Sequence, residues 1–443
     1  MTPLFIALAA IVFVIVGIAV FRLHAFFALV LAGLLTGVLG VATGVLELSY
    51  VQAVELVMTE LGSTAGKIVW VIVAAAVIGL CLSESGAAES IVDALLRWLG
   101  EKRAGLALLA GGFILSIPVF FDTVFILLLP LARALAKRTG GNYLYYLLAI
   151  CGGGVITHSN VPPTPGPLVL AEILQLDLGV AIGVGLAIGV PAAVVAWWLA
   201  ATLGRRVQLS NPPAAESASG ERRELPPLGL SLLPVLVPLG LIASAAWFGP
   251  EAGPWLALIG NKNMALLIAL VFALVLVLRY GGRNWRGLSP LMGEALEASG
   301  VIVLITSAGG AFGAMIKQVG IGDAIQSLTS GSGMNVLLLA WLLAAAIRIA
   351  QGSATVAMMT TGAIMTSLGP AVLGGTHIAY VYLAIGYGSF FCSWMNDSGF
   401  WLVSRLGGLT EGEALRSWTV LASGISVAGF IFTWVASLLV PLS

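Results

Sequence analysis

The sequence predicts an all-α polytopic membrane protein made of two inverted repeats, each with five crossings, one of them a broken helix, and one re-entrant hairpin. The first observation behind this prediction is composition. Of the 443 residues, 59% are hydrophobic and only 9% are charged, whereas an ordinary globular domain has about 25% charged residues. The second is a series of long apolar segments that occurs twice along the chain. The third is an uneven distribution of basic residues among the loops.

Composition also excludes several classes of partner. The formal net charge is zero, and no run of basic residues occurs, so we expect no nucleic-acid partner. The apolar composition indicates that the chain is surrounded by a lipid bilayer. Cys81, Cys151 and Cys392 lie in apolar stretches and are interpreted as small buried hydrophobes. Neither a disulfide framework nor a metal-ligand spacing is visible. We therefore expect no metal and no cofactor.

Apolar segments with the length of a membrane span divide the chain into two halves. In the first half, residues 1–203, they lie near 3–20, 25–45, 67–82, 104–136, 143–175 and 178–203. In the second half, residues 229–443, they lie near 229–248, 264–280, 299–316, 334–368, 376–405 and 418–440. The offset is about 234 residues throughout, which predicts two structural repeats. Residues 204–228, rich in Pro, Ser and Arg, are predicted to be the linker between them.

The segment 104–136 is too long for one straight crossing, because such a helix would measure about 50 Å against a hydrocarbon core of about 30 Å. Pro118 and Asp122 lie in its middle, and basic residues flank both of its ends. We interpret it as a re-entrant hairpin with its tip at residues 117–123; two complete short spans are the alternative. The repeat places a second hairpin at 334–368, with small residues at its tip.

The predicted topology follows from the number of crossings. Five crossings per half place the second half upside down relative to the first. Tracing the chain on this basis puts sixteen basic residues on one face and only Lys67, Lys262 and Lys317 on the other. By the positive-inside rule the first face is cytoplasmic. We therefore expect a cytoplasmic linker and both termini outside.

Two polar stretches interrupt the predicted spans 143–175 and 376–405, and we expect them to form the binding region. The first is THSNVPPTPGP, residues 157–167, with Ser159 and Asn160; the second contains Asn396, Asp397 and Ser398. A helix that restarts after such a break presents unpaired N–H groups to the gap, which suits an anion. Inverted repeats with broken helices are typical of secondary transporters. A channel or facilitator remains an alternative, whereas no catalytic constellation of an enzyme is visible.

Few ionisable groups fall inside the predicted spans, and their burial is expensive, so a function is the default hypothesis for each. They are Asp122, His158, Arg348 and Asp397. The aspartates are candidates for proton coupling, with His158 as a relay or as a fixed hydrogen-bond donor. A structural pair of Arg348 with either aspartate is the alternative.

The hairpin tips carry the remaining candidates for substrate binding. At the second tip lie Gln351, Gly352, Ser353 and Thr355, which offer donors and acceptors for a carboxylate or a polyol. Thr123 lies at the first tip. Close helix packing through small residues is the alternative interpretation of the second tip.

Four motifs in order, IPVFFDTVFILLLPL, THSNVPPTPGP, RIAQGSATVAMMTTG and NDSGFWLVSRLGGLT, resemble the gluconate:proton symporter family of permeases, within the ion-transporter superfamily. The similarity covers nearly the whole chain. It implies uptake of gluconate or related hydroxy acids such as idonate, fructuronate or glycerate, and of D-serine in one branch, across a bacterial inner membrane. It further implies an elevator movement against a dimeric scaffold, and hence a homodimer.

The matching motifs imply that Asp122, His158, Arg348, Gln351, Ser353, Thr355, Asn396 and Asp397 form the site. The chain departs from the pattern at Ala25, Thr164 and Trp394, where a proline and two histidines are expected. Proton coupling therefore falls on Asp122, Asp397 and His158. We expect proton-coupled uptake of a small hydroxy-carboxylate by alternating access. Sodium-coupled transport of a carboxylate or D-serine, and uncoupled facilitation, are the alternatives.

Overall fold

The computed structural model describes residues 2–139, 142–210, 224–249, 253–320, 335–367, 376–395, 397–440 and 442. Within these residues every regular element is helical and no strand occurs. Seven of the described helices are long and apolar enough to cross a membrane. The prediction of an all-α, multi-pass membrane protein is therefore confirmed.

The described helices are divided between the two halves of the chain. The first half contains α1 (Thr2–Ala19), α2 (Ala25–Ala42), α3 (Tyr50–Glu84), α4 (Ala87–Leu99), α5 (Ala104–Leu115), α6 (Phe121–Thr139), α7 (Tyr143–Asn160), α8 (Pro165–Ile173) and α9 (Leu178–Arg206), with a 3-10 turn at Glu101–Arg103. The second half contains α10 (Leu228–Phe248), α11 (Gly253–Ile259), α12 (Lys262–Tyr280), α13 (Trp285–Gln318), α15 (Val336–Gln351), α16 (Ala354–Ser367), α18 (Ile378–Gly388), α19 (Ser398–Gly407), α20 (Glu411–Ala414), the π-helical turn Leu415–Thr419 and α21 (Val420–Leu439).

The helix starts are related by a nearly constant spacing. The first residues of α3 and α13, Tyr50 and Trp285, are 235 positions apart, and those of α8 and α19, Pro165 and Ser398, are 233 positions apart. Helices α3 and α13, and helices α8 and α19, thus occupy corresponding positions in the two halves of the sequence, whereas among the described helices α11 has no counterpart in the first half.

Two predicted spans are too short, and this is the main correction to the sequence-based fold. The segments 67–82 and 299–316 are parts of α3 and α13, which have 35 and 34 residues. Acidic residues near the start of each helix lower the hydropathy there without ending the helix. The start is set by a cap instead, because the Ser49 and Gln52 side chains form a capping box at α3. Helices α4 and α11 were not predicted from the sequence.

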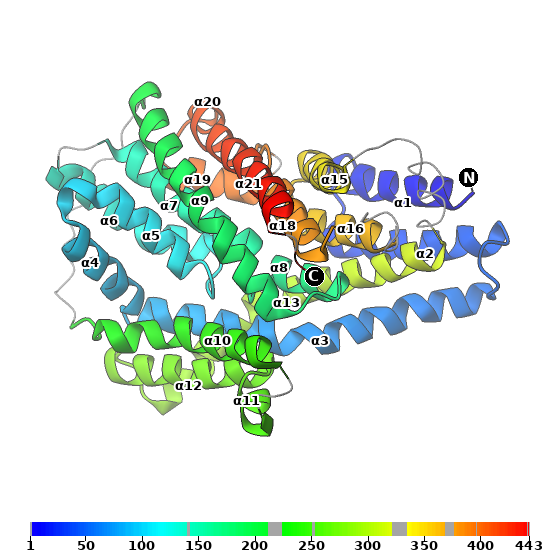
Figure 1. Cartoon of the computed structure of the whole chain (residues 1–443), viewed down its shortest axis with the longest axis horizontal. Coiled ribbons are helices and arrows are strands. Elements are labelled where there is room, and N and C mark those ends of the chain that lie inside the picture. The colour runs from blue at the N-terminus through cyan, green and yellow to red at the C-terminus, as the bar shows by residue number, and fades with distance from the viewer. Residues whose placement is uncertain are drawn as a thin grey trace.

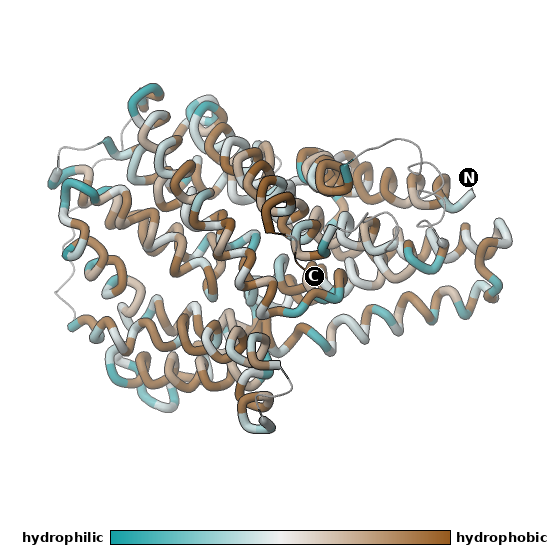
Figure 2. The backbone as a smooth tube through the Cα atoms, in the orientation of Figure 1, coloured by the Kyte–Doolittle hydropathy of each residue, from teal (hydrophilic) through white to brown (hydrophobic). Residues whose placement is uncertain are grey.

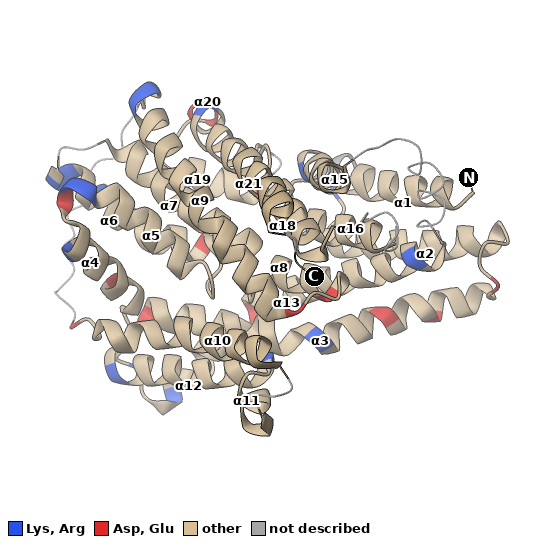
Figure 3. Cartoon of the chain, in the orientation of Figure 1, with Lys and Arg blue, Asp and Glu red and all other residues tan. Residues whose placement is uncertain are grey.

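The two interrupted segments lie in different regions of the molecule, α15 and α16 beside α1 and α13 and α5 and α6 away from them (Figure 1). Helices α3 and α13 pack along each other and extend toward the N-terminus, whereas α4, α5 and α6 lie at the opposite end. Figure 2 shows hydrophobic residues along most of the helices and hydrophilic ones mainly at helix ends and in loops. In Figure 3 Lys and Arg gather around the ends of α4, α6, α9 and α12.

Glycine allows the closest helix packing, and it does so in both halves. A Cβ added to Gly153 of α7 would clash with the Leu109 carbonyl oxygen of α5, and one on Gly112 would lie 2.6 Å from the Ile150 carbonyl oxygen. In the second half, a Cβ on Gly388 of α18 would lie 2.6 Å from the Trp341 carbonyl oxygen of α15. Small residues at such contacts bring backbones together where no hydrophobic effect drives association.

The ends of the predicted linker are attached to the helices, while residues 211–223 lie outside the described part of the chain. The backbone N–H of Ser210 donates to Glu413 Oε1 of α20 at 2.6 Å. At the other end, Ser90 Oγ of α4 donates to the Pro226 carbonyl oxygen at 2.7 Å. These contacts attach one flank of the linker to α20 and the other to α4.

Candidate functional site

Both helical segments predicted as hairpins are interrupted where the tips were expected. Helix α5 ends at Leu115 and α6 begins at Phe121. Helix α15 ends at Gln351, and the next residue, Gly352, has φ 87°, a left-handed conformation that glycine adopts without strain. Ser353 then starts α16, because its Oγ accepts from the Val356 N–H at 3.3 Å. The predicted tips therefore coincide with real helix ends.

The two predicted breaks are also real. After α7, Thr164 Oγ1 donates to the His158 and Val161 carbonyl oxygens at 2.9 and 2.8 Å, which closes the turn before α8. After α18, Asp397 caps α19 through Oδ1, which accepts from the Gly399 N–H at 3.0 Å. The charged residue of the second break is thus built into the helix start.

A buried ion pair joins the second break to the second interrupted segment. Arg348 of α15 donates through Nη2 to Asp397 Oδ2, and Ser393 Oγ donates to the same oxygen. Arg348 and Asp397 are only 4% and 6% exposed. Within the described residues, the buried Nε of Arg348 has no hydrogen-bond partner. Such charges are tolerated because they neutralise each other, so the pairing left open by the sequence is the one observed.

An aromatic bridge connects this pair to the first half of the chain. Trp418 Nε1 donates to Ser393 Oγ at 2.8 Å. The Trp418 ring stacks on Phe121 of α6, with centroids 5.7 Å apart, and the Phe121 centroid lies 6.5 Å from that of His158. Trp418 lies in the π-helical turn Leu415–Thr419. Elements from both halves therefore meet around one cluster.

Sequence reasoning missed three members of this cluster: Phe121, Ser393 and Trp418. Ser393 and Phe121 each lie within four residues of a predicted aspartate, and that proximity is a usable signal. Trp418 is separated from Ser393 by 25 residues and a helix start, and no spacing rule connects them.

The first-half candidates occupy different environments around the cluster. Asp122, in the first turn of α6, is exposed. Thr123 is partly buried. His158 has a buried Nδ1 without a hydrogen-bond partner among the described residues. Two carboxylates, one guanidinium and one imidazole are thus arranged around the interrupted helices.

Asn160 and Ser159 lie in a packed region between helices. Ser159 is 1% exposed. Asn160 Nδ2 donates to the Ile156 carbonyl oxygen at 2.9 Å, and Tyr382 OH donates to the Asn160 carbonyl oxygen at 2.9 Å. A Cβ on Gly386 of α18 would clash with Asn160 Oδ1. The amide therefore fits against α18, and its buried Oδ1 has no partner in the described part of the chain.

The remaining candidates are divided between surface and interior. Ser398 is exposed at the start of α19, and Ser353 and Thr355 are partly buried. Thr355 Oγ1 lies 3.6 Å from where a Cβ on Gly166 would be, so the second tip adjoins the start of α8. Asn396 falls outside the described residues, and of Gln351 only the backbone is described. No group of His, Cys, Asp and Glu that could hold a metal occurs in the described residues.

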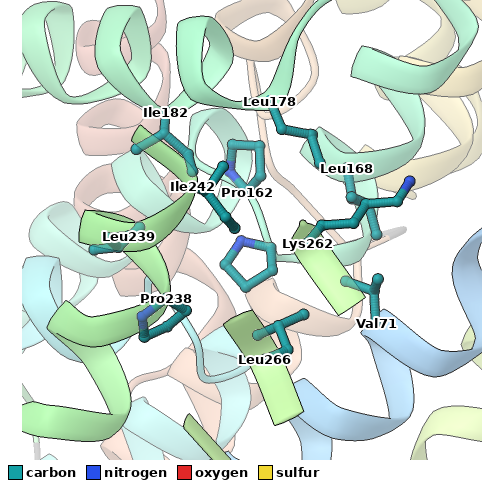
Figure 4. A pocket seen from close by; sticks show the side chains of 11 residues that line it. Val71, Pro162, Leu168, Leu178, Ile182, Pro238, Leu239, Ile242, Lys262 and Leu266 are labelled. Atoms are coloured by element: carbon teal, nitrogen blue, oxygen red, sulfur yellow. The ribbon is translucent and has the colours of Figure 1, made fainter. Parts of the chain in front are cut away.

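The prolines of the first break face other helices (Figure 4). Pro162 lies beside Ile182 of α9 and Leu239 and Ile242 of α10, around a gap of only about 10 Å³. Leu266 of α12 lines the same gap. Since this volume barely admits one water, the proline side of the break is an apolar packing surface and leaves no room for a substrate.

Comparison with known proteins identifies the relatives of the chain. The model of the GntP family permease matches residues 2–439. The chain is 33% identical to the inner membrane permease YgbN of Escherichia coli, covering 98% of each. It is 33% identical to a gluconate permease of Pseudomonas aeruginosa, covering 98% of this chain and 97% of the relative. It is 32% identical to the Gnt-II system L-idonate transporter of Escherichia coli, covering 97% and 98%.

Two solved structures share the fold. The Alcanivorax borkumensis YdaH transporter superposes with a TM-score of 0.69 at 15% identity, covering 88% of this chain and 90% of that one. Neisseria gonorrhoeae MtrF, an antimetabolite efflux pump, superposes with a TM-score of 0.70 at 17% identity, covering 95% and 96%. At these identities the similarity concerns the arrangement of helices alone.

Proposed function

The chain belongs to the GntP family of permeases, and from this premise we propose that it couples inward proton movement to the uptake of gluconate or a related small hydroxy-carboxylate. The family and the relatives are permeases and transporters, so the chain is a transporter and not an enzyme. The gluconate and L-idonate transporters among the relatives support the substrate class. The observation that carries the proposal is the buried Arg348–Asp397 pair at the second break.

In this proposal the substrate carboxylate replaces Asp397 as the partner of Arg348. A guanidinium offers several donors in one plane, which suits a carboxylate, and the unpartnered Nε of Arg348 supplies one of them. Ser353, Thr355 and Gln351 with Gly352 at the second tip, and Thr123 at the first, would bind hydroxyl groups. Ser159, Asn160, Asn396 and Ser398 would complete the site at the restarted helices.

The same exchange explains coupling. Arg348 can leave Asp397 at low cost only if a proton neutralises that carboxylate, because an unpaired buried charge is strongly unfavourable. Proton binding at Asp397 and anion binding at Arg348 therefore favour each other. Asp122, which follows Phe121 of the aromatic bridge at the start of α6, is the second proton acceptor, and His158 is the relay. One proton carried with one monoanion moves no net charge.

We further propose how the chain sits in a bacterial inner membrane. Residues 1–203 and 229–443 form inverted repeats with five crossings and one re-entrant hairpin each, joined by the cytoplasmic linker 204–228, with both termini outside. The equal spacing of helix starts and the gathering of basic residues support this arrangement. The apolar packing of Pro162 against α10 suits a sliding contact, and elevator-type alternating access in a homodimer is the proposed movement.

Uptake by reconstituted protein tests the proposal. Liposomes with a pH dye inside receive labelled gluconate, L-idonate or D-serine, with either a proton or a sodium gradient directed inward. We expect accumulation above the external concentration, driven by protons and accompanied by internal acidification. Accumulation driven by sodium alone supports the sodium-coupled alternative, and equilibration without accumulation supports a facilitator; either result contradicts proton symport.

A further inference from the structure

A polar hollow lies away from the Arg348–Asp397 ion pair, between α3, α8, α13 and α16. Its volume is about 350 Å³, which lies in the range of small-molecule sites, about 300–1,000 Å³. The side chains that matter here are Glu60, Thr64, Lys67, Glu172, Lys317 and Thr366. None of them belongs to the Arg348–Asp397 cluster.

The residue spacing along α3, and likewise along α13, places the lining residues of each helix on a single face of that helix. On α3, Glu60, Thr64 and Lys67 are four and then three residues apart, so they share one face of the helix. On α13, Gly310, Gly313 and Lys317 are three and then four residues apart, so they too share one face. The two long helices therefore turn matching faces toward the hollow, each with a lysine on it.

Glycine keeps the floor of the hollow narrow and free of larger side chains. A Cβ on Gly310 would clash with Thr64 of α3, and one on Gly313 would lie 2.8 Å from the Cβ of Ala363 in α16. On the opposite wall, Thr366 Oγ1 donates to the Gly362 carbonyl oxygen at 2.8 Å and lies 3.3 Å from that of Ile173. The hollow thus has walls held by direct contacts between helices.

The charge of the hollow favours an anion. Glu172 is already paired with Lys262 at the start of α12, and both side chains are largely buried. Neither Lys67 nor Lys317 forms a salt bridge within the described residues, although both are exposed to the hollow. Glu60 is the other carboxylate on its lining. Among the described residues, the hollow therefore contains two ammonium groups without a salt bridge, those of Lys67 and Lys317, and one such carboxylate, that of Glu60, so its net charge is positive.

We propose that this hollow is a second, weak binding site for a small polyhydroxy monocarboxylate. Lys67 and Lys317 bind its carboxylate, and Glu60 and Thr64 accept or donate hydrogen bonds to its hydroxyl groups. The ligand class rests on the proposed function, and so does the role of the site, because both lysines belong to the face assigned as external. There the hollow raises the local concentration of substrate before it reaches Arg348.

Equilibrium dialysis of purified protein with labelled D-gluconate tests the site directly. The variant R348Q/D397N removes the central pair without leaving an unpaired charge, and gel filtration verifies its fold. We expect it to retain weak binding that K67Q/K317Q abolishes and that uncharged D-glucitol does not displace. The control K102Q/K137Q removes two exposed lysines elsewhere and should leave this binding unchanged. Absence of weak binding, or its survival without Lys67 and Lys317, overturns the proposal.

Uptake kinetics separate this proposal from the proposed function. With the central pair intact, K67Q/K317Q should raise the KM for gluconate about two- to fivefold at low salt, as expected for exposed charges, with kcat unchanged. The difference should disappear at high salt, where such charges are screened. An unchanged KM at low salt contradicts the proposal. If the wild-type protein transports no acid, the proposed function fails, and the dialysis result alone decides whether the hollow binds the anion.

Discussion

The two breaks follow the same backbone plan but carry different chemistry. In the first, Thr164 satisfies backbone oxygens and Pro162 packs against α10. In the second, Asp397 caps a helix and pairs with Arg348 of a neighbouring interrupted segment. The two breaks therefore differ in the charged residues that they contain. The second half carries a self-compensated ion pair, whereas the first half contributes an aromatic ring, an imidazole and an exposed aspartate.

This difference assigns separate roles within the proposed transport cycle. A buried pair that neutralises itself can exchange one partner for a substrate anion, so recognition belongs to the second half. The exposed carboxylate of Asp122, in the first half, is suited to respond to the charge state of that pair. Phe121 of the first half and Trp418 of the second half stack on each other beside the pair.

Removal of one member of the pair should have the largest effect. Arg348→Gln leaves Asp397 buried without a counter-charge, and we expect a loss of about 3–5 kcal/mol in the free energy of unfolding together with loss of uptake. Chemical denaturation in detergent and liposome uptake measure the two effects. The double variant R348Q/D397N should recover most of the stability and none of the uptake. Equal instability of the single and double variants would show that the pair does not act as a unit.

The packing of the two halves should be more alike than their charges. Gly153→Ala forces a methyl group into the α5 backbone, and we expect a loss of about 1–3 kcal/mol in unfolding free energy from overpacking. Gly388→Ala should cost a similar amount against α15. As a control, Gly183 of α9 has nothing within 4 Å of an added Cβ, so Gly183→Ala should be neutral or stabilising by up to about 1 kcal/mol. A tolerated Gly153→Ala contradicts the close packing.

Asp122→Asn should have the smallest energetic effect and the most selective one. Because this carboxylate is exposed, its replacement should leave stability unchanged. We expect gradient-driven uptake to fall at least about tenfold, or roughly 1.4 kcal/mol, while exchange of labelled for unlabelled substrate continues. Asp397→Asn should impair both. Concentrative uptake at the wild-type rate by Asp122→Asn would remove this residue from the coupling scheme.

Much of the fold could be predicted, because helix breaks have strong local signals. Pro118 and the prolines after Val161 end helices where they were expected to, and Gly352 marks the second tip. The extensions of α3 and α13 could not be predicted in the same way. Glu55 and Glu60 resemble loop residues when hydropathy is averaged over a window, whereas a helix end is decided by caps such as Ser49.

The site was predictable only in part, for a related reason. Arg348, Asp397, Asp122 and His158 stand out because a charged or titratable group in an apolar run is rare. Trp418 does not stand out, because aromatic residues are common in spans, and its contact with Ser393 depends on how α20 meets the second break. Asn160 stood out, yet its side chain packs against Gly386, a contact that depends on the crossing of α7 and α18.

The π-helical turn at Leu415–Thr419 has an evolutionary consequence. Such a turn is equivalent to one residue inserted into an α-helix, and here it carries Trp418 toward Phe121 and Ser393. Deletion of one residue would rotate the preceding turn by about 100° relative to α21 and carry the indole away from both contacts. The stack of Phe121 on Trp418 can therefore diverge among homologous permeases through a single-codon insertion or deletion, with both charged residues of the pair unchanged.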